Sequence, residues 1–337
     1  MTERIGVVRE LLLREPRSVA RNFVLQASGD REHREAGLDD GVVELDLRFG
    51  KGLICYGGQD AVGAAVFPLS EENSIQAVMV AADGCSFGDK TNSAKAAKIA
   101  VEHNLLGWDY LIHKNEVPKM VMLRGIINKV NELVVSELNE GVTTVTVAVV
   151  SHELVNGRKQ IFLDIAWVGD SQVMLLGFDN ENNSYFVEKL VIPHDCLYGL
   201  ILNKLELEDD IGMKCSQTSL RQARQDALNE LEASRRYRSG IFAHLGESEG
   251  ESGLFISTRR INISQEYLAL GKNGLKLVVC SDNLGDKVPE DIIRESYLQH
   301  FNDNSAFATS LGRYMANQDL DDGCMVVADL GFNSGGK

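Results

Sequence analysis

The order of strand-like and helix-like segments constrains the fold of this chain more than any other feature. Short β-branched or alternating runs predict strands, and a 3.6-residue apolar period predicts helices. The predicted strands are 42–49, 61–69, 76–82, 143–150, 161–168, 172–178, 185–192, 254–263, 275–280 and 324–330. The predicted helices are 92–106, 119–138, 218–236, 289–301 and 305–317. Strands and helices come in separate runs rather than in βαβ alternation, which predicts an α+β fold of two mainly antiparallel sheets with helices outside them.

The same pattern predicts one large domain with flanking segments. Residues 1–41 are typical of an amphipathic lead-in followed by a polar loop, and residues 331–337 form a Gly/Ser-rich tail. Residues 42–330 are expected to form the domain, and a chain of 337 residues is long enough to bury a large core. Residues 194–252 have the weakest pattern and are expected to be an insertion, with a Gly/Ser/Glu loop at 246–253.

The charge of the chain indicates which partners to expect. With 34 Lys+Arg and 49 Asp+Glu, the net charge is −15. Nucleic acids and anionic membranes repel such a chain, so neither is expected as its partner. No apolar run is long enough to span a bilayer, and charges interrupt the first residues, so neither a transmembrane helix nor a signal peptide is predicted. The six cysteines form no CxxC pair, which is typical of free thiols in the cytoplasm, although a nuclear protein would look the same. The pattern leaves the oligomeric state open.

Five aspartates recur at the ends of predicted strands or in the turns between them. They are Asp60, Asp83, Asp170, Asp282 and Asp321. Carboxylates that gather at one rim of a sheet repel one another and cannot all ionise unless a cation lies between them. Their hard oxygens suit Mg²⁺ or Mn²⁺, and two such ions can activate a water and hold a phosphoryl group. The set indicates a possible binuclear hydrolase site, whereas an Asp-Gly pair at a strand end is usually only a turn, and that interpretation is the commoner one for any single one of the five aspartates.

Six short motifs contain these aspartates or lie between them. They are Gln59-Asp60-Ala61, Ala82-Asp83-Gly84, Gly141-Val142-Thr143-Thr144-Val145, Val168-Gly169-Asp170-Ser171, Val279-Cys280-Ser281-Asp282 and Asp321-Asp322-Gly323-Cys324-Met325-Val326-Val327. In this order, over about residues 50–330, the chain resembles a divergent branch of the PPM/PP2C family of metal-dependent Ser/Thr protein phosphatases. The resemblance implies a β-sandwich flanked by helix pairs, with a metal site in a cleft at one end.

The resemblance also implies a role for each aspartate. Asp83 would bridge two Mg²⁺ or Mn²⁺ ions, with the carbonyl of Gly84 as a further ligand. Asp282 and Asp321 would hold the first ion and Asp60 the second, so that catalysis would depend above all on Asp83 and Asp60. A third, weakly bound ion would involve the aspartate of the Gly-Asp-Ser turn, Asp170. A metal-bridging water would attack the phosphoserine or phosphothreonine of a phosphoprotein substrate, and no phosphoenzyme would form.

Several positions depart from the family pattern. Cys55 stands where the family usually has a phosphate-binding arginine, and Gln59 stands where it usually has an acidic residue. Because a bidentate arginine contact both binds and orients a phosphate, its loss would weaken substrate binding. Asp322 replaces an asparagine, which leaves Asp321 and Asp322 as alternative ligands. A protein Ser/Thr phosphatase is therefore the expected function. The alternatives are a pseudophosphatase that serves as a binding or scaffold module, and a phosphatase for small phosphorylated molecules.

Four other residues near the motifs invite a chemical role. His194 is either a general acid near the cleft or, as is commoner for histidine, a structural residue. Ser171 and Ser281 lie beside aspartates, but neither lies in a GxSxG motif, so neither is expected to be a nucleophile. Cys85 follows Asp83-Gly84 and is expected to be a small packing residue rather than a redox-sensitive thiol.

Overall fold

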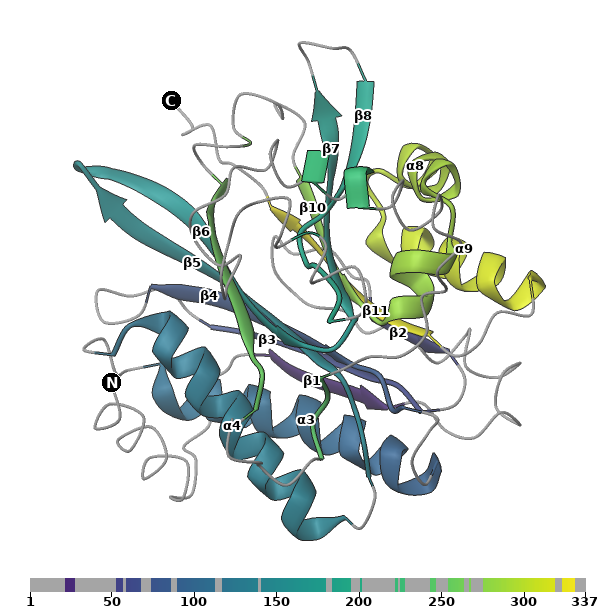
Figure 1. The fold of residues 1–337 in the computed structure, drawn as a ribbon. Helices are drawn as coiled ribbons and strands as arrows, with labels where there is room; N and C mark the ends of the chain where they lie inside the picture. The colour runs from purple at the N-terminus through teal and green to yellow at the C-terminus, as the bar shows by residue number, and fades with distance from the viewer. Residues whose placement is uncertain are drawn as a thin grey trace.

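Two antiparallel sheets lie face to face at the centre of the structure, and a pair of helices covers the outer face of each (Figure 1). The computed structural model describes residues 22–27, 53–56, 59–67, 74–85, 90–112, 117–138, 141–179, 184–194, 201, 222–223, 225–227, 243–246, 254–263, 267, 275–318 and 323–330.

Within these residues, the first sheet has six strands in the order β1-β3-β4-β5-β6-β9. They are β1 (Asn22–Ala27), β3 (Ala61–Val66), β4 (Ile75–Ala82), β5 (Val145–Val155), β6 (Arg158–Val168) and β9 (Ser257–Asn262). The second sheet has five described strands in the order β2-β11-β10-β7-β8. They are β2 (Leu53–Tyr56), β7 (Gln172–Asp179), β8 (Ser184–Lys189), β10 (Leu275–Cys280) and β11 (Gly323–Leu330). Neighbouring strands pair antiparallel in both sheets. The predicted α+β fold with two antiparallel sheets is confirmed.

The helices form two pairs, one on each outer face. The first sheet is covered by α3 (Lys90–Leu111) and α4 (Lys119–Glu137), and the second by α8 (Glu290–Gln299) and α9 (Asn304–Asn317). A short π-helix, η2 (Asn283–Lys287), lies between β10 and α8. No helix in the described part of the chain combines the length and the apolar character needed to cross a membrane.

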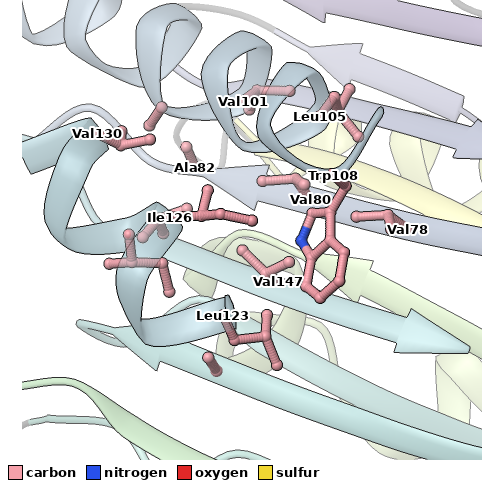
Figure 2. Close-up of a cluster of buried hydrophobic side chains, with 14 of the residues drawn as sticks. Val78, Val80, Ala82, Val101, Leu105, Trp108, Leu123, Ile126, Val130 and Val147 are labelled. Carbon is pink, nitrogen blue, oxygen red and sulfur yellow. The ribbon is translucent and has the colours of Figure 1, made fainter. Parts of the chain in front are cut away.

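Strand β4 shows how one strand serves two layers. Val78 and Val80 face the helices, in a cluster that includes Trp108 of α3 (Figure 2). Met79 and Ala81 face the second sheet, in the cluster between the sheets. The strand is thus buried on both sides, which is why its sequence is a continuous apolar run rather than an alternating one. A third cluster fills the space between the second sheet and α8 and α9.

Most predicted elements are present, with some ends shifted. Helix α3 runs beyond its predicted end at residue 106 to Leu111, and in the hairpin of β5 and β6 the strands run beyond residues 150 and 161 toward the turn. The two strands meet at Asn156-Gly157, where φ is 52° and 74°. Positive φ at both central residues is the geometry of a type I′ turn, which continues the twist of the strands and so lets the pairing reach the turn itself.

Strand β1 corrects one expectation. It lies inside residues 1–41, which the sequence pattern assigns to a lead-in, and it pairs with β3 as the edge strand of the first sheet. The paired strands therefore begin before residue 42. A single short apolar run, Phe-Val-Leu, is too brief to set a period, and β2 escapes prediction for the same reason.

Some expectations fall on residues outside those described. The strand expected at 42–49 and the tail at 331–337 lie there, and so do most of 194–252 and of the helix expected at 218–236. The division of the chain into a domain, an insertion and a tail therefore stays a prediction.

Candidate metal centre

The antiparallel register of β3 and β4 brings the first two aspartates to the same edge of the first sheet. Ala61 pairs with Ala82, so Asp60 directly precedes β3 at the place where Asp83 directly follows β4. Asp60 is almost fully buried, and both of its carboxylate oxygens are shielded from solvent. A buried carboxylate loses its hydration and needs compensation from other groups. Asp60 is therefore unlike an aspartate in an exposed surface turn.

Two threonines hold the backbone of Asp83 from the start of β5. The Asp83 amide donates to Thr144 Oγ1 at 3.2 Å. The Asp83 carbonyl accepts from the Thr144 amide at 2.8 Å and from Thr143 Oγ1 at 2.8 Å. Both backbone groups of Asp83 are thereby used, which fixes the direction of its side chain. The sequence indicates the Gly-Val-Thr-Thr-Val motif but assigns it no role, and the structure makes it the scaffold of Asp83.

The same hydroxyl groups extend to the Asp170 turn. Thr144 Oγ1 and Ser171 Oγ are 2.7 Å apart, and Thr146 Oγ1 donates to the Ser171 carbonyl at 2.8 Å. These bonds tie the start of β7 to β5 and place Asp170 next to the Asp83 scaffold. Asp170 Oδ1 is buried. Ser171 is fully buried with its hydroxyl group used in the scaffold, which agrees with the expectation that it is no nucleophile.

Asp282 reaches the same region from the second sheet. The preceding residue, Ser281, binds Cys324 twice: its amide donates to the Cys324 carbonyl at 3.1 Å, and its Oγ accepts from the Cys324 amide at 3.0 Å. Asp282 follows, at the N-terminal end of the π-helix η2. Asp282 Oδ1 is buried and has no hydrogen-bond partner among the described residues. Asp321 lies outside the described residues, but the Ser281–Cys324 bonds place the start of β11 beside Asp282.

The carboxyl groups act on one another electrostatically. The pKa of Asp83 is raised well above its usual value, first by burial, then by the charges of Asp60 and Asp282, a hydrogen bond with Asp282, and the charge of Asp170. The structure thus brings together Asp60, Asp83, Asp170 and Asp282, from four separate strand ends.

Two further residues near the cluster are structural. Burial, followed by the charges of Asp170, Asp282 and Asp60, raises the pKa of the Cys85 thiol, so the thiolate needed for redox chemistry is disfavoured. His194 is fully buried, and burial lowers its pKa to about 3, which removes it as a general acid near neutral pH.

Solved structures match this chain, whereas family models and curated proteins do not. A scan against models of protein families finds no match, and a search of curated proteins finds none either. Serine-threonine phosphatase 2C from Toxoplasma gondii matches with a TM-score of 0.52 at 10% identity, over 91% of this chain and 99% of that one. The serine/threonine phosphatase of S. agalactiae matches with a TM-score of 0.51 at 15% identity, over 82% and 97%. A mutant form of a bacterial serine phosphatase gives 0.51 at 14%, over 92% and 97%.

The chain has the PP2C fold. The resemblance seen in the six motifs and the likeness in three dimensions therefore agree on the architecture. At these identities the PP2C likeness concerns the fold, and the roles expected for the individual aspartates remain predictions.

The acidic cluster of this PP2C-fold chain suits a hard divalent cation. Within the described residues, no three His, Cys, Asp or Glu side chains stand in an arrangement that holds a metal ion by itself, and the expected ligand Asp321 lies outside them. The donor chemistry nevertheless fits: buried carboxyl oxygens at Asp60 and Asp282 and a carboxyl group at Asp83 with a strongly raised pKa. A cation among such groups replaces repulsion by attraction, and Mg²⁺ and Mn²⁺ prefer oxygen ligands of this kind.

Position 84 accepts only glycine without a shift of the surrounding backbone. A Cβ atom there would lie 2.7 Å from the carbonyl oxygen of Gln59 and 2.9 Å from that of Ser93, and both are backbone atoms that cannot move aside cheaply. Gly84 also forms an isolated β-bridge with Thr143. The absence of a side chain lets the backbone next to Asp83 pack directly between the start of β3 and α3.

Substitution Gly84→Ala is expected to lower the free energy of unfolding by about 1–3 kcal/mol, because the backbone of Gln59 or Ser93 must shift. It is also expected to weaken Mn²⁺ binding at least tenfold. Urea unfolding and calorimetric titration measure the two effects. Gly157→Ala is the control: with φ of +74° and no atom within 4 Å, it adds backbone strain of about 1 kcal/mol but leaves metal affinity unchanged. Unchanged Mn²⁺ affinity in Gly84→Ala would separate this glycine from the metal centre.

Proposed function

We propose that this chain is a Mg²⁺- or Mn²⁺-dependent phosphatase that hydrolyses phosphoserine and phosphothreonine in proteins. The observation that supports the proposal most is the action of three aspartates, Asp60, Asp170 and Asp282, on the buried carboxyl group of Asp83. The fold, shared with proteins named as Ser/Thr phosphatases, agrees with it. The proposed compartment is the cytoplasm, where the free thiols of Cys85, Cys280 and Cys324 would stay reduced.

The proposed ligands are the aspartates already described. Asp83 would be a ligand of two ions, with the carbonyl of Gly84 as a further ligand. Asp282 and Asp321 would hold the first ion, and Asp60 would hold the second. Asp170 would contribute to a third, weaker site. When bound, such ions supply a water that is nucleophilic at neutral pH and stabilise the charge of the phosphoryl group.

The contribution of the chain itself is to hold these carboxyl groups in fixed positions. The backbone of Asp83 is fixed by Thr143 and Thr144, and Asp282 is fixed through the bonds of Ser281 to β11. Preorganised ligands of this kind do not have to rearrange during the reaction. The side chains that could act as nucleophiles nearby are used elsewhere: Ser281 is fully buried and accepts from Cys324. The proposal therefore needs no covalent phosphoenzyme.

A pseudophosphatase is the second candidate, and two residues favour it. Cys55 and Gln59 stand where the family resemblance implies an arginine and an acidic residue. A chain that binds metal and phosphoprotein without turnover would fit these losses. A phosphatase for small phosphorylated molecules is the third candidate. Loss of the phosphate-binding arginine would change which substrates bind, while the aspartates proposed as metal ligands are still present.

Turnover assays distinguish the three candidates. Phosphate release from phosphoserine, phosphothreonine and phosphotyrosine peptides and from a panel of small phosphate esters is measured with Mn²⁺, with Mg²⁺ and with EDTA. The proposal predicts metal-dependent release from the first two peptides, abolished by EDTA. Metal binding without release from any substrate would establish the pseudophosphatase, and release only from small esters would establish the third candidate.

Cys55→Arg tests the missing clamp. The residue lies in β2, paired with Cys324 of β11, whose first residues follow Asp321. A bidentate arginine–phosphate contact is worth about 1.5–3 kcal/mol, so the variant is expected to lower KM for a phosphopeptide at least tenfold. Steady-state kinetics measure the change, and Cys55→Lys is the matched control, because lysine adds the same charge without the fork of donors. An unchanged KM in Cys55→Arg would mean that another group already binds the phosphate.

A further inference from the structure

His194 holds both backbone groups of a single glycine. Its own amide donates to the Gly169 carbonyl at 2.9 Å, and its Nδ1 accepts from the Gly169 amide at 3.1 Å. The two residues are 25 positions apart, and the second lies beyond the end of β8. His194 therefore binds both the amide and the carbonyl of Gly169, although neither residue belongs to a strand.

The imidazole has a defined tautomer. Because Nδ1 accepts a hydrogen bond, the ring proton is on Nε2, from which it donates to Ser257 Oγ of β9 at 2.9 Å. Rings of Trp167 and Phe255 pack against the imidazole, with centroids 5.9 Å and 4.8 Å away. Burial lowers the pKa of His194 to about 3, so the ring stays neutral and Nδ1 stays an acceptor near neutral pH.

Gly169 occupies a conformation that depends on such support. Its φ is +99°, in the left-handed region, and a Cβ there would lie 2.5 Å from Thr144 Cγ2. The next residue is Asp170, whose charge acts on Asp83 and on Cys85. The bonds to Gly169 therefore set the direction in which the turn presents the carboxyl group of Asp170.

We propose that His194 is a positioning residue for the metal centre, whose neutral Nδ1 fixes the Gly169 amide and thereby orients Asp170 toward Asp83. The inference rests on the proposed function, since it takes Asp170 as a metal ligand. Residues that orient ligands without touching the metal commonly affect metal affinity by about 10- to 100-fold. His194 would act only through Gly169 and Asp170, with no contact to substrate.

Two substitutions separate the acceptor role from the bulk of the ring. The Oδ1 of asparagine stands close to the place of Nδ1, so His194→Asn keeps an acceptor for the Gly169 amide. The amide group of glutamine reaches the place of Nε2, so His194→Gln keeps the contact to Ser257 and loses that acceptor. Both variants remove the same aromatic packing. We expect His194→Gln to weaken the weakest Mn²⁺ site by at least tenfold and His194→Asn by no more than about threefold.

The experiment has two readouts. Calorimetric titration with Mn²⁺ gives the affinities, with Asp170→Asn as the reference for complete loss of the ligand. Amide hydrogen exchange of Gly169, measured without metal, reports the hydrogen bond from the Gly169 amide to residue 194. The exchange is expected to be at least tenfold faster in His194→Gln than in the wild type and nearly unchanged in His194→Asn. Should His194→Gln fail to fold, Ser257→Ala replaces it, because it frees the ring to change tautomer, and faster Gly169 exchange is again expected.

The outcomes are distinguishable. Equal Mn²⁺ affinities and equal exchange in the two His194 variants, with equal loss of melting temperature, would reduce His194 to a packing residue and overturn the inference. Unchanged Gly169 exchange in His194→Gln, or in Ser257→Ala where that variant replaces it, would also overturn it. A wild-type protein that binds no Mn²⁺ at all would instead contradict the proposed function. Tight Mn²⁺ binding by both the wild type and His194→Gln would contradict only the role of His194.

Discussion

Asp83→Asn is expected to lower kcat on a phosphoserine peptide by at least about 100-fold while leaving the protein folded. The carboxyl group of Asp83 is the one on which three other aspartates act, and its backbone is fixed by Thr143 and Thr144. Asparagine keeps the shape of the side chain but cannot bridge two cations. A loss of about 3 kcal/mol in stabilisation of the transition state corresponds to this decrease in rate.

The stability of Asp83→Asn without metal is not expected to fall with its kcat. Asparagine removes one of several carboxyl groups that repel one another in a buried place, so in EDTA the variant is expected to be at least as stable as the wild type. Added Mn²⁺ should raise the melting temperature of the wild type but not that of Asp83→Asn, because a ligand that binds only the folded state stabilises it. Thermal unfolding with and without metal measures both effects and does not depend on activity.

Asp164→Asn is the matched control for this substitution. Asp164 lies in β6, its side chain is fully buried, and burial raises its pKa to about 6. It is therefore another buried carboxyl group with a raised pKa, outside the acidic cluster. Its variant is expected to keep wild-type kcat and the wild-type response to Mn²⁺. A similar loss of activity in both variants would mean that loss of any buried carboxyl group disturbs the protein, and full activity in Asp83→Asn would remove Asp83 from the mechanism.

The sequence pattern predicts the layers of the fold well because the strands are buried on one or both faces. β10 is found at the predicted residues, and α4 ends within one residue of its predicted end. The first is a short apolar run that contains Val278 and Val279, and the second has apolar residues at helical spacing, so each pattern favours the element that is found. The same reasoning fails for β1 and β2, which are too short to show a period. It also misses the full β5–β6 hairpin, although Asn156-Gly157 is a strong turn signal that could have shown it.

The site was predictable in its residue types and not in its supports. Aspartates at strand ends suggest a common edge, and the register of β3 and β4 explains why Asp60 and Asp83 share one. The hydrogen bonds that position the aspartates join residues far apart in the chain, such as Thr144 with Ser171 and His194 with Gly169. A lone histidine after a strand has no local pattern that indicates its partner. Only the folded backbone brings that partner near.

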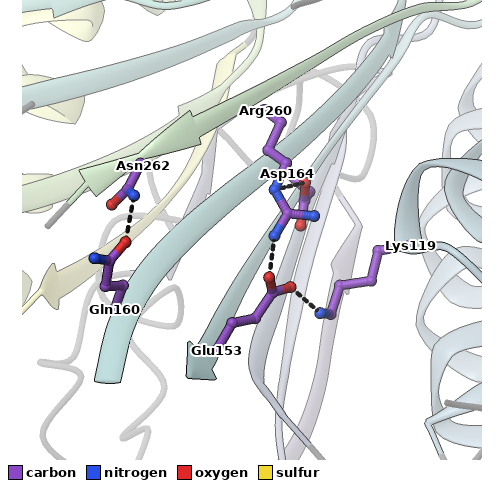
Figure 3. Close-up of polar contacts among 6 residues, drawn as sticks. All are labelled: Lys119, Glu153, Gln160, Asp164, Arg260 and Asn262. Atoms are coloured by element: carbon purple, nitrogen blue, oxygen red, sulfur yellow. Dashed lines mark hydrogen bonds and ion pairs between the residues drawn. The ribbon is translucent and has the colours of Figure 1, made fainter. Parts of the chain in front are cut away.

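Opposite dependences of stability on pH are expected for Asp164→Asn and His194→Asn. Asp164 lies on the helix-facing side of the first sheet, 3.7 Å from Arg260 Nε, in a network in which Glu153 also binds Arg260 and Lys119 (Figure 3). Burial is the main cause of its raised pKa, the charges of Arg260 and Lys119 lower the pKa, and Glu153 raises it. The folded state therefore binds a proton at Asp164 more readily than the unfolded state, whose pKa is 3.8.

The sign of the Asp164 contribution follows from this difference. A raised pKa in the folded state contributes stability that is fully present below pH 3.8 and is lost as the pH rises through about 6. Asparagine removes the contribution. Relative to the wild type, Asp164→Asn should therefore lose about 2 kcal/mol of stability when the pH falls from 7 to 4.5.

His194 contributes with the opposite sign. Burial lowers its pKa from 6.5 to about 3, so its stabilising contribution is present above pH 6.5 and is lost as the pH falls toward 3. Between pH 7 and 4.5 the wild type should lose about 2–3 kcal/mol through this residue. His194→Asn, which cannot be protonated in this range, should gain the same amount relative to the wild type.

Urea unfolding at pH 7 and at pH 4.5, in EDTA, measures both differences. Comparison with the wild type at each pH cancels the titration of the acidic cluster, which all three proteins share. In the wild type the two contributions oppose each other over most of this range, so its own stability profile conceals them. Parallel profiles for the two variants would contradict the prediction, because they would mean that neither the neutral His194 ring nor the buried Asp164 carboxyl group differs in proton affinity between the folded and unfolded states.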